Sequence, residues 1–228
     1  MEEQAGARIG AAYPLGGLSR LFWQLNPVGV SRRGTPAILD GITMHPEQLE
    51  KIIRPVAMPN YTVDFSWRDL DRLFAMFEAY GYELSPDFQR GHVWTADQQR
   101  HYVENAMRDN LSNQARLISF NAPAWSRDVS GDLPETVLCI DGLQRITAVQ
   151  ALMAGRIKPF GLTLEDVEGS EFDPLRRNNH RFSFKVAVFK YQNRSELLHY
   201  YIDLNGGGTP HSAEEIQRVK AMRDQLNR

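Results

Sequence analysis

Residues 141–145, Asp-Gly-Leu-Gln-Arg, carry the polar groups best suited to chemistry in this sequence. They follow an apolar run at residues 137–140, which is typical of a buried strand, and they open a pattern with helical spacing. Free N–H groups at a helix N-terminus carry partial positive charge and suit a phosphate. Gly142 allows close backbone approach, and the side chains of Gln144 and Arg145 can both reach phosphate oxygens. The segment therefore predicts a phosphate site in which Gln144 and Arg145 take part in catalysis.

Asp141 is the unusual member of this segment, because a carboxylate beside a phosphate repels it unless a cation lies between them. Mg²⁺ held by one carboxylate and by phosphate oxygens is the natural bridge. Asp141 is therefore predicted to be a metal ligand, or else the group that orients an attacking water. A structural interpretation stays open beside this one: Asp141 is then a helix N-cap, Gln144 is its capping-box partner and Arg145 is a surface residue.

A second polar cluster occupies residues 87–94, just before another pattern with helical spacing. Gln89 and Arg90 stand beside Gly91 and are suited to form the other wall of an anion site. Trp94 ends the cluster and can stack on a nucleobase. The alternative is that the aromatic residues of this segment, Trp94 included, belong to the core.

A third cluster, residues 205–210, places three consecutive glycines after Asn205. Such a run permits a nest of backbone N–H groups that holds an anion, so Asn205, Gly207 and Thr209 are predicted to bind the ligand. The alternative is a flexible linker between two helices. A basic loop at residues 176–181 is suited to contact with a nucleic-acid backbone, although most such runs are solvated loops.

The composition limits the classes of function. The chain has 228 residues, 42% of them hydrophobic and 24% charged, which is ordinary for a globular protein. The formal net charge of −2 gives no general attraction to DNA, so nucleic-acid contact would need a local patch. The single cysteine lies in an apolar run, which favours a buried thiol. No stretch reaches the roughly 20 apolar residues that span a bilayer, and the acidic N-terminus is unlike a signal peptide. We expect a protein of the cytoplasm, or of a host cytoplasm, without a membrane partner.

Periodicity predicts the elements that position these residues. Helices are expected from 66 to 81, 95 to 109, 143 to 154, 195 to 204 and 212 to the C-terminus, with strands at 116–121, 136–140 and 181–191 and an extended piece at 82–90. Residues 1–65 are rich in glycine and proline, which predicts an irregular N-terminal extension that wraps the core or mediates contacts. Residues 66–228 form the predicted α+β domain, a small mixed sheet with packed helices.

The three clusters, taken in this order, resemble the N-terminal domain of GmrSD-type restriction endonucleases. The likeness rests on residues 88–94, 140–145 and 205–210 and covers residues 66–222. The middle motif is the most specific. Its usual form in that family is Asp-Gly-Gln-Gln-Arg, and Leu143 stands here in place of the first Gln.

The resemblance implies a fold similar to the ParB/sulfiredoxin superfamily. It also implies a domain that binds nucleoside triphosphates (NTPs), often hydrolyses them, and belongs to DNA-targeting defence or phage–host conflict. In that family the domain commonly works with a nuclease domain of the His-Asn-His type, and we expect the nuclease here to be separate from these 228 residues. The expected partners are therefore a nucleotide, DNA, and a separate nuclease subunit or a host protein.

Three functions stay open at this point. The first is an NTP-binding domain with Mg²⁺-dependent hydrolysis, in which Arg90, Gln144 and Arg145 grip phosphates and Asp141 holds the metal or positions water. The second is a DNA-binding protein or weak nuclease that uses Trp94 and the basic loop. The third is a non-catalytic interaction protein whose N-terminal extension contacts a partner.

Overall fold

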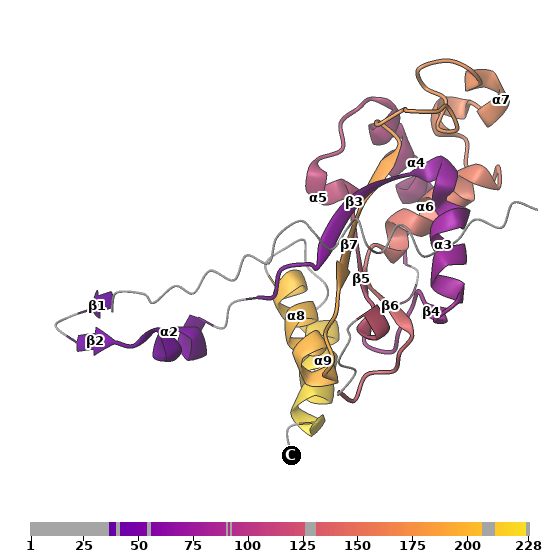
Figure 1. Ribbon diagram of the computed structural model, residues 1–228. Helices are drawn as coiled ribbons and strands as arrows, with labels where there is room; N and C mark the ends of the chain where they lie inside the picture. The colour runs from indigo at the N-terminus through magenta and orange to yellow at the C-terminus, as the bar shows by residue number, and fades with distance from the viewer. Residues whose placement is uncertain are drawn as a thin grey trace, which may run out of the picture. The chain divides into compact units, whose positions relative to one another are not determined.

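The computed structural model of this chain is drawn in Figure 1. The residues it describes are 37–39, 42–53, 56–89, 91, 93–125, 131–206 and 213–226. They fall into two compact units, residues 1–55 and residues 56–228. Within the described residues, none of the helices combines the length and the apolar character that crossing a membrane requires.

The described part of the N-terminal unit contains a short hairpin and one helix. Strand β1 (Ala37–Leu39) pairs antiparallel with β2 (Ile42–Met44), and helix α2 spans Pro46–Ile53. The glycine and proline residues of this segment predict no regular element here, since both break helices and strands. Pro46 instead occupies the first helical position, where its missing N–H costs no hydrogen bond.

The second unit is built on a mixed sheet of five strands in the order β3-β7-β5-β6-β4. The strands are β3 (Tyr61–Ser66), β4 (Tyr82–Glu83), β5 (Leu117–Asn121), β6 (Val137–Asp141) and β7 (Ser183–Phe189). β3 runs antiparallel to β7 and β5 antiparallel to β6, whereas β5–β7 and β4–β6 are parallel. This arrangement confirms the predicted α+β class with a small mixed sheet.

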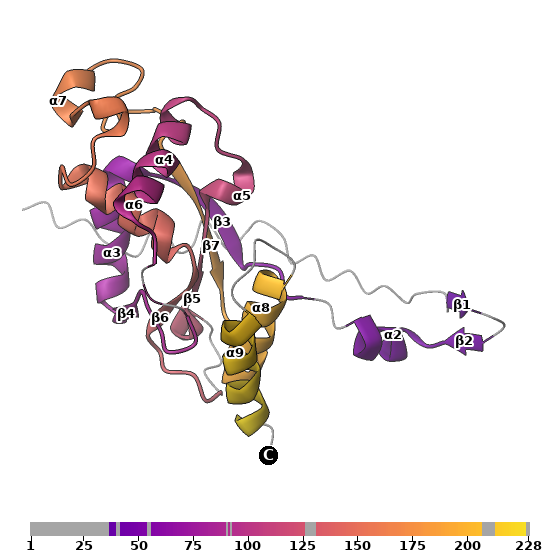
Figure 2. The same cartoon turned by 180° about the vertical axis from the view of Figure 1, so that it is seen from behind.

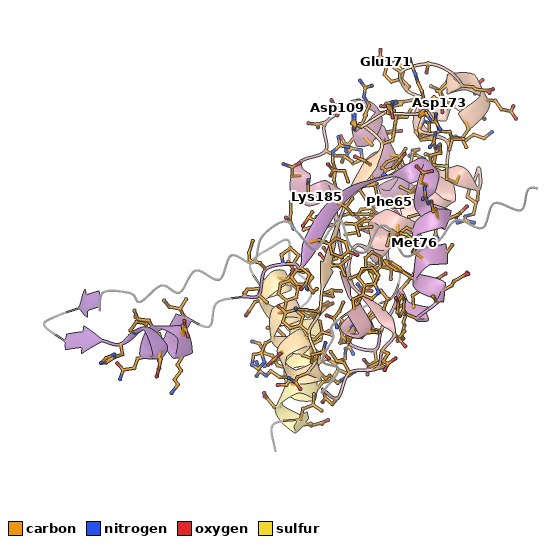
Figure 3. The ribbon with its side chains drawn as sticks, in the orientation of Figure 1. Phe65, Met76, Asp109, Glu171, Asp173 and Lys185 are labelled. Carbon is orange, nitrogen blue, oxygen red and sulfur yellow. The ribbon has the colours of Figure 1, made fainter. Side chains whose placement is uncertain are left out.

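The compact second unit begins ten residues before the boundary expected from the sequence. Residues 61–66 were assigned to the irregular extension, but they pair with β7 along the whole of β3. Lys185 of β7 is also 3.1 Å from the Asp64 carboxylate, and Figure 3 labels Lys185 beside this strand. Residues 61–66 alternate apolar and polar side chains, which is typical of a strand. The segment lies between a proline-containing stretch and the helix expected from Ser66, and the strand pattern was therefore overlooked.

Helices cover both faces of the sheet, as the two opposite views show (Figures 1 and 2). Helices α3 (Leu70–Glu78), α4 (Ala96–Met107) and α6 (Leu143–Met153) pack on one face in a large apolar cluster. Helices α8 (Arg194–Gly206) and α9 (Ala213–Leu226) pack on the other face in a smaller cluster. Short elements complete the unit, namely α5 (Asn113–Arg116), α7 (Leu164–Val167) and the 3-10 turns Trp67–Asp69, Pro123–Trp125 and Pro159–Gly161.

The predicted helices and strands of this unit agree with the observed ones, with differences at the ends. Thr95 and Gln98 form the predicted capping box before α4, whereas Ser66 makes no side-chain cap and a 3-10 turn precedes α3. The extended piece predicted at residues 82–90 is a strand only over β4, and turns follow it. The predicted cap at Ser212 lies outside the described residues.

Candidate functional site

A pocket on the α8 side of the sheet brings together residues from all three sequence clusters. It is lined by Gln89, Ile140, Asp141, Leu143, Gln144, Tyr201 and Asn205. Gln89 comes from the second cluster, Asp141 and Gln144 from the first, and Asn205 from the third. The pocket measures about 280 Å³, counting the part that is open to solvent. The enclosed part is only about 30 Å³, far below the usual range of small-molecule sites, so it has room for an ion or for one small group of a larger ligand.

A bulge in β6 decides which way Asp141 points. Asp141 pairs with Ser119 of β5, whereas Cys139 pairs with the adjacent residue Phe120, so Ile140 is the extra residue in β6. Such a bulge reverses the alternation of side chains and re-aims the residue that follows it. Ile140 packs in the cluster beneath α8, and Asp141 lines the pocket beside it. Without the bulge, Asp141 would share the face of Cys139, which is the face of α6.

Gly142 is the N-cap of α6, and its backbone explains why glycine stands there. Its φ is +116°, which side chains rarely adopt, and a Cβ atom at this position would lie 2.5 Å from Ile118 Cγ2. The structural interpretation of Asp141 as the N-cap is therefore wrong. The need for glycine comes from the packing of the turn on β5, and ligand approach is not required to account for it.

Asp141 and Arg145 form an ion pair one helical turn apart. Arg145 Nη1 lies 3.0 Å from Asp141 Oδ2 and donates a 2.7 Å hydrogen bond to the carbonyl oxygen of Leu117. The side chains are 29% and 20% exposed respectively, so the pair is partly shielded from water. Arg145 was predicted to grip a phosphate. In the structure its Nη1 bonds both Asp141 and β5, and its contact with a phosphate stays a prediction.

Gln144 uses its amide to hold the second cluster. Its Oε1 accepts from the backbone N–H groups of Val93 at 3.1 Å and Trp94 at 3.0 Å, and its Nε2 donates to the carbonyl of Gly91 at 3.1 Å. This bonding corrects the capping-box interpretation, in which the amide would turn back to its own helix. Because both amide atoms of Gln144 are already bonded, the group that can make the predicted phosphate contact is its backbone N–H.

The loop that carries Gln89 is held from the other side by arginines of α8 and α9. Arg194 Nη2 lies 2.7 Å from both carboxylate oxygens of Asp87. Arg218 donates to the carbonyl oxygens of Asp87 at 2.7 Å and Phe88 at 3.2 Å. Since these bonds connect segments more than 100 residues apart, sequence spacing could not reveal them.

Two residues near Asp141 were missed by the sequence analysis. Ser119 is buried opposite Asp141 on β5, and Tyr200 on α8 lies close enough for both residues to affect the pKa of its phenol. Burial, together with the negative charge of Asp141, raises the pKa of Tyr200 to about 12. A phenol with that pKa stays protonated at neutral pH. The only available signal was the register of two strands, which the sequence does not give.

Cys139 lies beneath the site as a buried thiol, as the sequence analysis predicted. Burial and the nearby Asp141 carboxylate raise its pKa to about 12, against a smaller lowering by Gln89, Arg145 and the backbone of Leu143. A thiol held protonated in this way is neither a nucleophile nor a metal ligand near neutral pH.

The remaining predicted site residues have different outcomes. Trp94 is half-buried and packs against Tyr102 at a ring distance of 5.6 Å, in agreement with the core alternative. Asn205 lines the pocket and donates through Nδ2 to the carbonyl of Tyr201 at 2.8 Å. Arg90, Gly207 and Thr209 lie outside the described residues.

The basic loop at residues 176–181 is partly tied into the protein. Arg181 donates to the carbonyl of Met107 and pairs with Glu171, while Arg116 pairs with Asp109 and donates to the carbonyl of Arg181. Glu171 and Asp109, the two acidic partners, are labelled in Figure 3. These contacts fix the base of the loop, while Arg176 and Arg177 are exposed.

The oxygen atoms of the pocket fit a hard cation as part of a larger ligand. Asp141 is the one carboxylate among the described residues that line the pocket, and no group of three or more His, Cys, Asp or Glu within the described part of the chain is arranged to hold a metal. The Oε1 atom of Gln89 is buried without a hydrogen-bond partner in that same part of the chain. One carboxylate with neutral oxygens is a donor set that Mg²⁺ accepts when phosphate supplies further ligands.

Comparison with known proteins adds no assignment to this geometry. No family model matches the chain, and neither a curated protein nor a solved structure matches it.

Proposed function

We propose that this protein binds a nucleoside triphosphate at the β6–α6 junction and hydrolyses it with Mg²⁺. The observation that carries the proposal is the convergence of Gln89, Asp141, Gln144 and Asn205 on one pocket, although they come from three segments of the sequence. The proposed setting in DNA-targeting defence or phage–host conflict rests on the resemblance of the three motifs alone.

The start of α6 supplies donors for a phosphate. The first intrahelical bond runs from Ile146 N to Gly142 O, so the N–H groups of Gln144 and Arg145 precede it. Such groups carry the positive end of the helix dipole and bind anions. Gln144 lies on the wall of the pocket, which brings this helix end to the ligand.

Asp141 is the group proposed to act in hydrolysis. Its Oδ2 is held by Arg145, which fixes the direction of the carboxylate. A carboxylate in this position can hold or orient a water molecule for attack on phosphorus. Mg²⁺, when bound, would neutralise charge on the phosphate oxygens. The Arg145 guanidinium acts here by positioning Asp141.

The test is a thermal-shift measurement with ATP, GTP, CTP and UTP, each with and without Mg²⁺. A ligand at ~100 times its dissociation constant stabilises the folded protein by about 2.7 kcal/mol, which is readily detected. We expect one nucleotide to act strongly with Mg²⁺, and Asp141→Asn to lose that Mg²⁺-dependent part and the release of phosphate.

Asp64→Asn is the matched control, because Asp64 is also paired with a cation but lies on β3, outside the pocket lining. It should leave both the nucleotide response and turnover unchanged. A flat response of the unmodified protein to all four nucleotides would refute the proposal.

A second candidate function, contact with a protein partner, is favoured by the N-terminal unit. Ile52 and Ile53 of α2 are each 67% exposed, and no described side chain of this helix is buried. Exposed apolar residues that adjoin on one helix are common at protein interfaces. A double Ile52→Ser and Ile53→Ser variant should lose a partner such as a nuclease subunit without losing the nucleotide response.

A further inference from the structure

Gln89 lines the pocket and holds a buried oxygen that has no hydrogen-bond partner among the described residues. Its Nε2 donates to the carbonyl oxygen of Ile140 at 3.1 Å and lies 3.8 Å from Cys139 Sγ. The Ile140 carbonyl oxygen can only accept a hydrogen bond, so the Gln89 side-chain atom facing it must be the nitrogen. This bond therefore fixes the orientation of the Gln89 amide. Oε1 is left buried without a hydrogen-bond partner among the described residues, in a side chain that lines the pocket. A buried acceptor of this kind calls for a ligand, an ion or a water.

The Gln89 side chain is held in place before any ligand arrives. Its loop is anchored by Arg194 and Arg218 just before it and by the Gln144 amide just after it. Phe88 is fully buried against Tyr201, with a ring distance of 5.3 Å. Preorganisation on both sides lowers the entropy that binding must overcome.

The neighbouring polar groups of the pocket offer further oxygen atoms. Asp141 presents a carboxylate of which Oδ2 is paired with Arg145. Asn205 uses Nδ2 on the carbonyl of Tyr201, so Oδ1 is the atom that can serve a ligand. Carboxylate and amide oxygens are the ligands that Mg²⁺ and related hard cations take from proteins.

We infer that Gln89 is a ligand of the divalent cation, contributing Oε1 beside Asp141 and Asn205. This assignment rests on the proposed function, because a pocket with a single carboxylate binds such a cation weakly until phosphate oxygens join it. It gives the second sequence cluster a role in metal binding, where the sequence suggested an anion-binding wall.

Gln192 provides the comparison that isolates this role. Its Nε2 also donates to backbone carbonyls, those of Pro123 and Lys190, and its Oε1 is also buried without a described partner. It does not line the pocket. If substitution of either glutamine weakens cation binding equally, the cause is loss of a buried amide in general. If only substitution of Gln89 weakens it, the cause is loss of a cation ligand.

The experiment measures Mn²⁺ binding by electron paramagnetic resonance, first with Mn²⁺ alone and then with Mn²⁺ and each of the four nucleotides. Gln89→Met should weaken Mn²⁺ binding on the order of tenfold, and Gln192→Met should leave it unchanged. Gln89→Glu keeps an oxygen and adds a negative charge, so it should tighten Mn²⁺ binding. Destabilisation of the fold cannot produce that opposite effect.

The outcomes separate this assignment from the proposed function. Nucleotide binding with equal Mn²⁺ affinity in Gln89→Met and the unmodified protein would overturn the role of Gln89 and leave the function standing. Mn²⁺ binding that depends on Gln89 without any nucleotide response would support the cation site and remove the function. Absence of Mn²⁺ binding under every condition would overturn the assignment.

Discussion

The two faces of the five-stranded sheet differ in what they bury. The face beneath α3, α4 and α6 holds a continuous apolar core that includes fully buried aromatic rings such as Phe77 and Phe120. The face beneath α8 and α9 holds a smaller core, and polar groups interrupt it at Ser119 and at the pocket around Asp141. One face therefore supplies stability, and the other combines packing with a site.

The bulge in β6 connects these two roles. It leaves Cys139 on the apolar side and turns Asp141 toward α8 within two residues. Because the same strand serves both faces, a substitution at the junction can affect stability, ligand binding or both. The following changes separate these effects, in order of decreasing size.

Phe77→Ala should lower the free energy of unfolding by about 3–5 kcal/mol, since it removes a fully buried ring that packs on Phe120 at 4.9 Å. Urea denaturation measures the loss. Met76→Ala on the same helix is the control, because Met76, labelled in Figure 3, is 47% exposed and should change stability little. Equal losses in both variants would mean that α3 does not bury its face as described.

Gly142→Ala should cost about 3 kcal/mol, combining backbone strain at a positive φ with the clash against Ile118. Gly155→Ala is the control, since its φ is +66° but a Cβ there would meet open space, so only about 1 kcal/mol is expected. Urea denaturation of the two variants should show this order. The reverse order would contradict the close contact between the turn and β5.

Asp141→Asn should change stability by only about 1 kcal/mol or less, because its ion pair with Arg145 is partly exposed. It should nevertheless lower the pKa of Tyr200, since the carboxylate charge is one of the causes that raise it. Nuclear magnetic resonance of labelled tyrosine measures that pKa. An unchanged titration would show that Tyr200 does not sense Asp141.

The raised pKa of Cys139 should make the free energy of unfolding depend on pH, but only weakly near neutral pH. Its pKa is raised from 9.0 to about 12 in the folded state, so its contribution to stability is complete below pH 9 and is lost as pH rises from 9 toward 12. Urea denaturation at pH 8 and pH 10 should show a decline that is smaller in Cys139→Ala. A thiol reagent at pH 8 should label the native protein only as fast as it opens. Rapid labelling would contradict the burial of β6.

The sequence determined the elements and their order, because apolar spacing and caps are local signals. Thr95 with Gln98, and the apolar run 137–140 before Gly142, were sufficient to predict α4, β6 and α6. It also selected Gln89, Asp141, Gln144 and Asn205 as site residues, since polar groups beside glycine at element ends are locally recognisable. Strand β3 was not predicted, although its apolar and polar residues alternate, because it adjoins the proline-containing segment that was assigned to the extension. Helix α2 was not predicted because Pro46 was interpreted as a helix breaker.

Only the tertiary structure decided what each of these side chains does. The Gln144 amide holds Gly91, Val93 and Trp94, which lie about 50 residues earlier, and local spacing does not reveal that contact. The Arg145 side chain holds Asp141 one helical turn away and the carbonyl of Leu117 on β5. Contact of the two residues with a ligand stays a prediction. Whether Asp141 faces α6 or α8 depends on one extra residue in strand pairing, a property of register between β5 and β6 that periodicity within one strand does not contain.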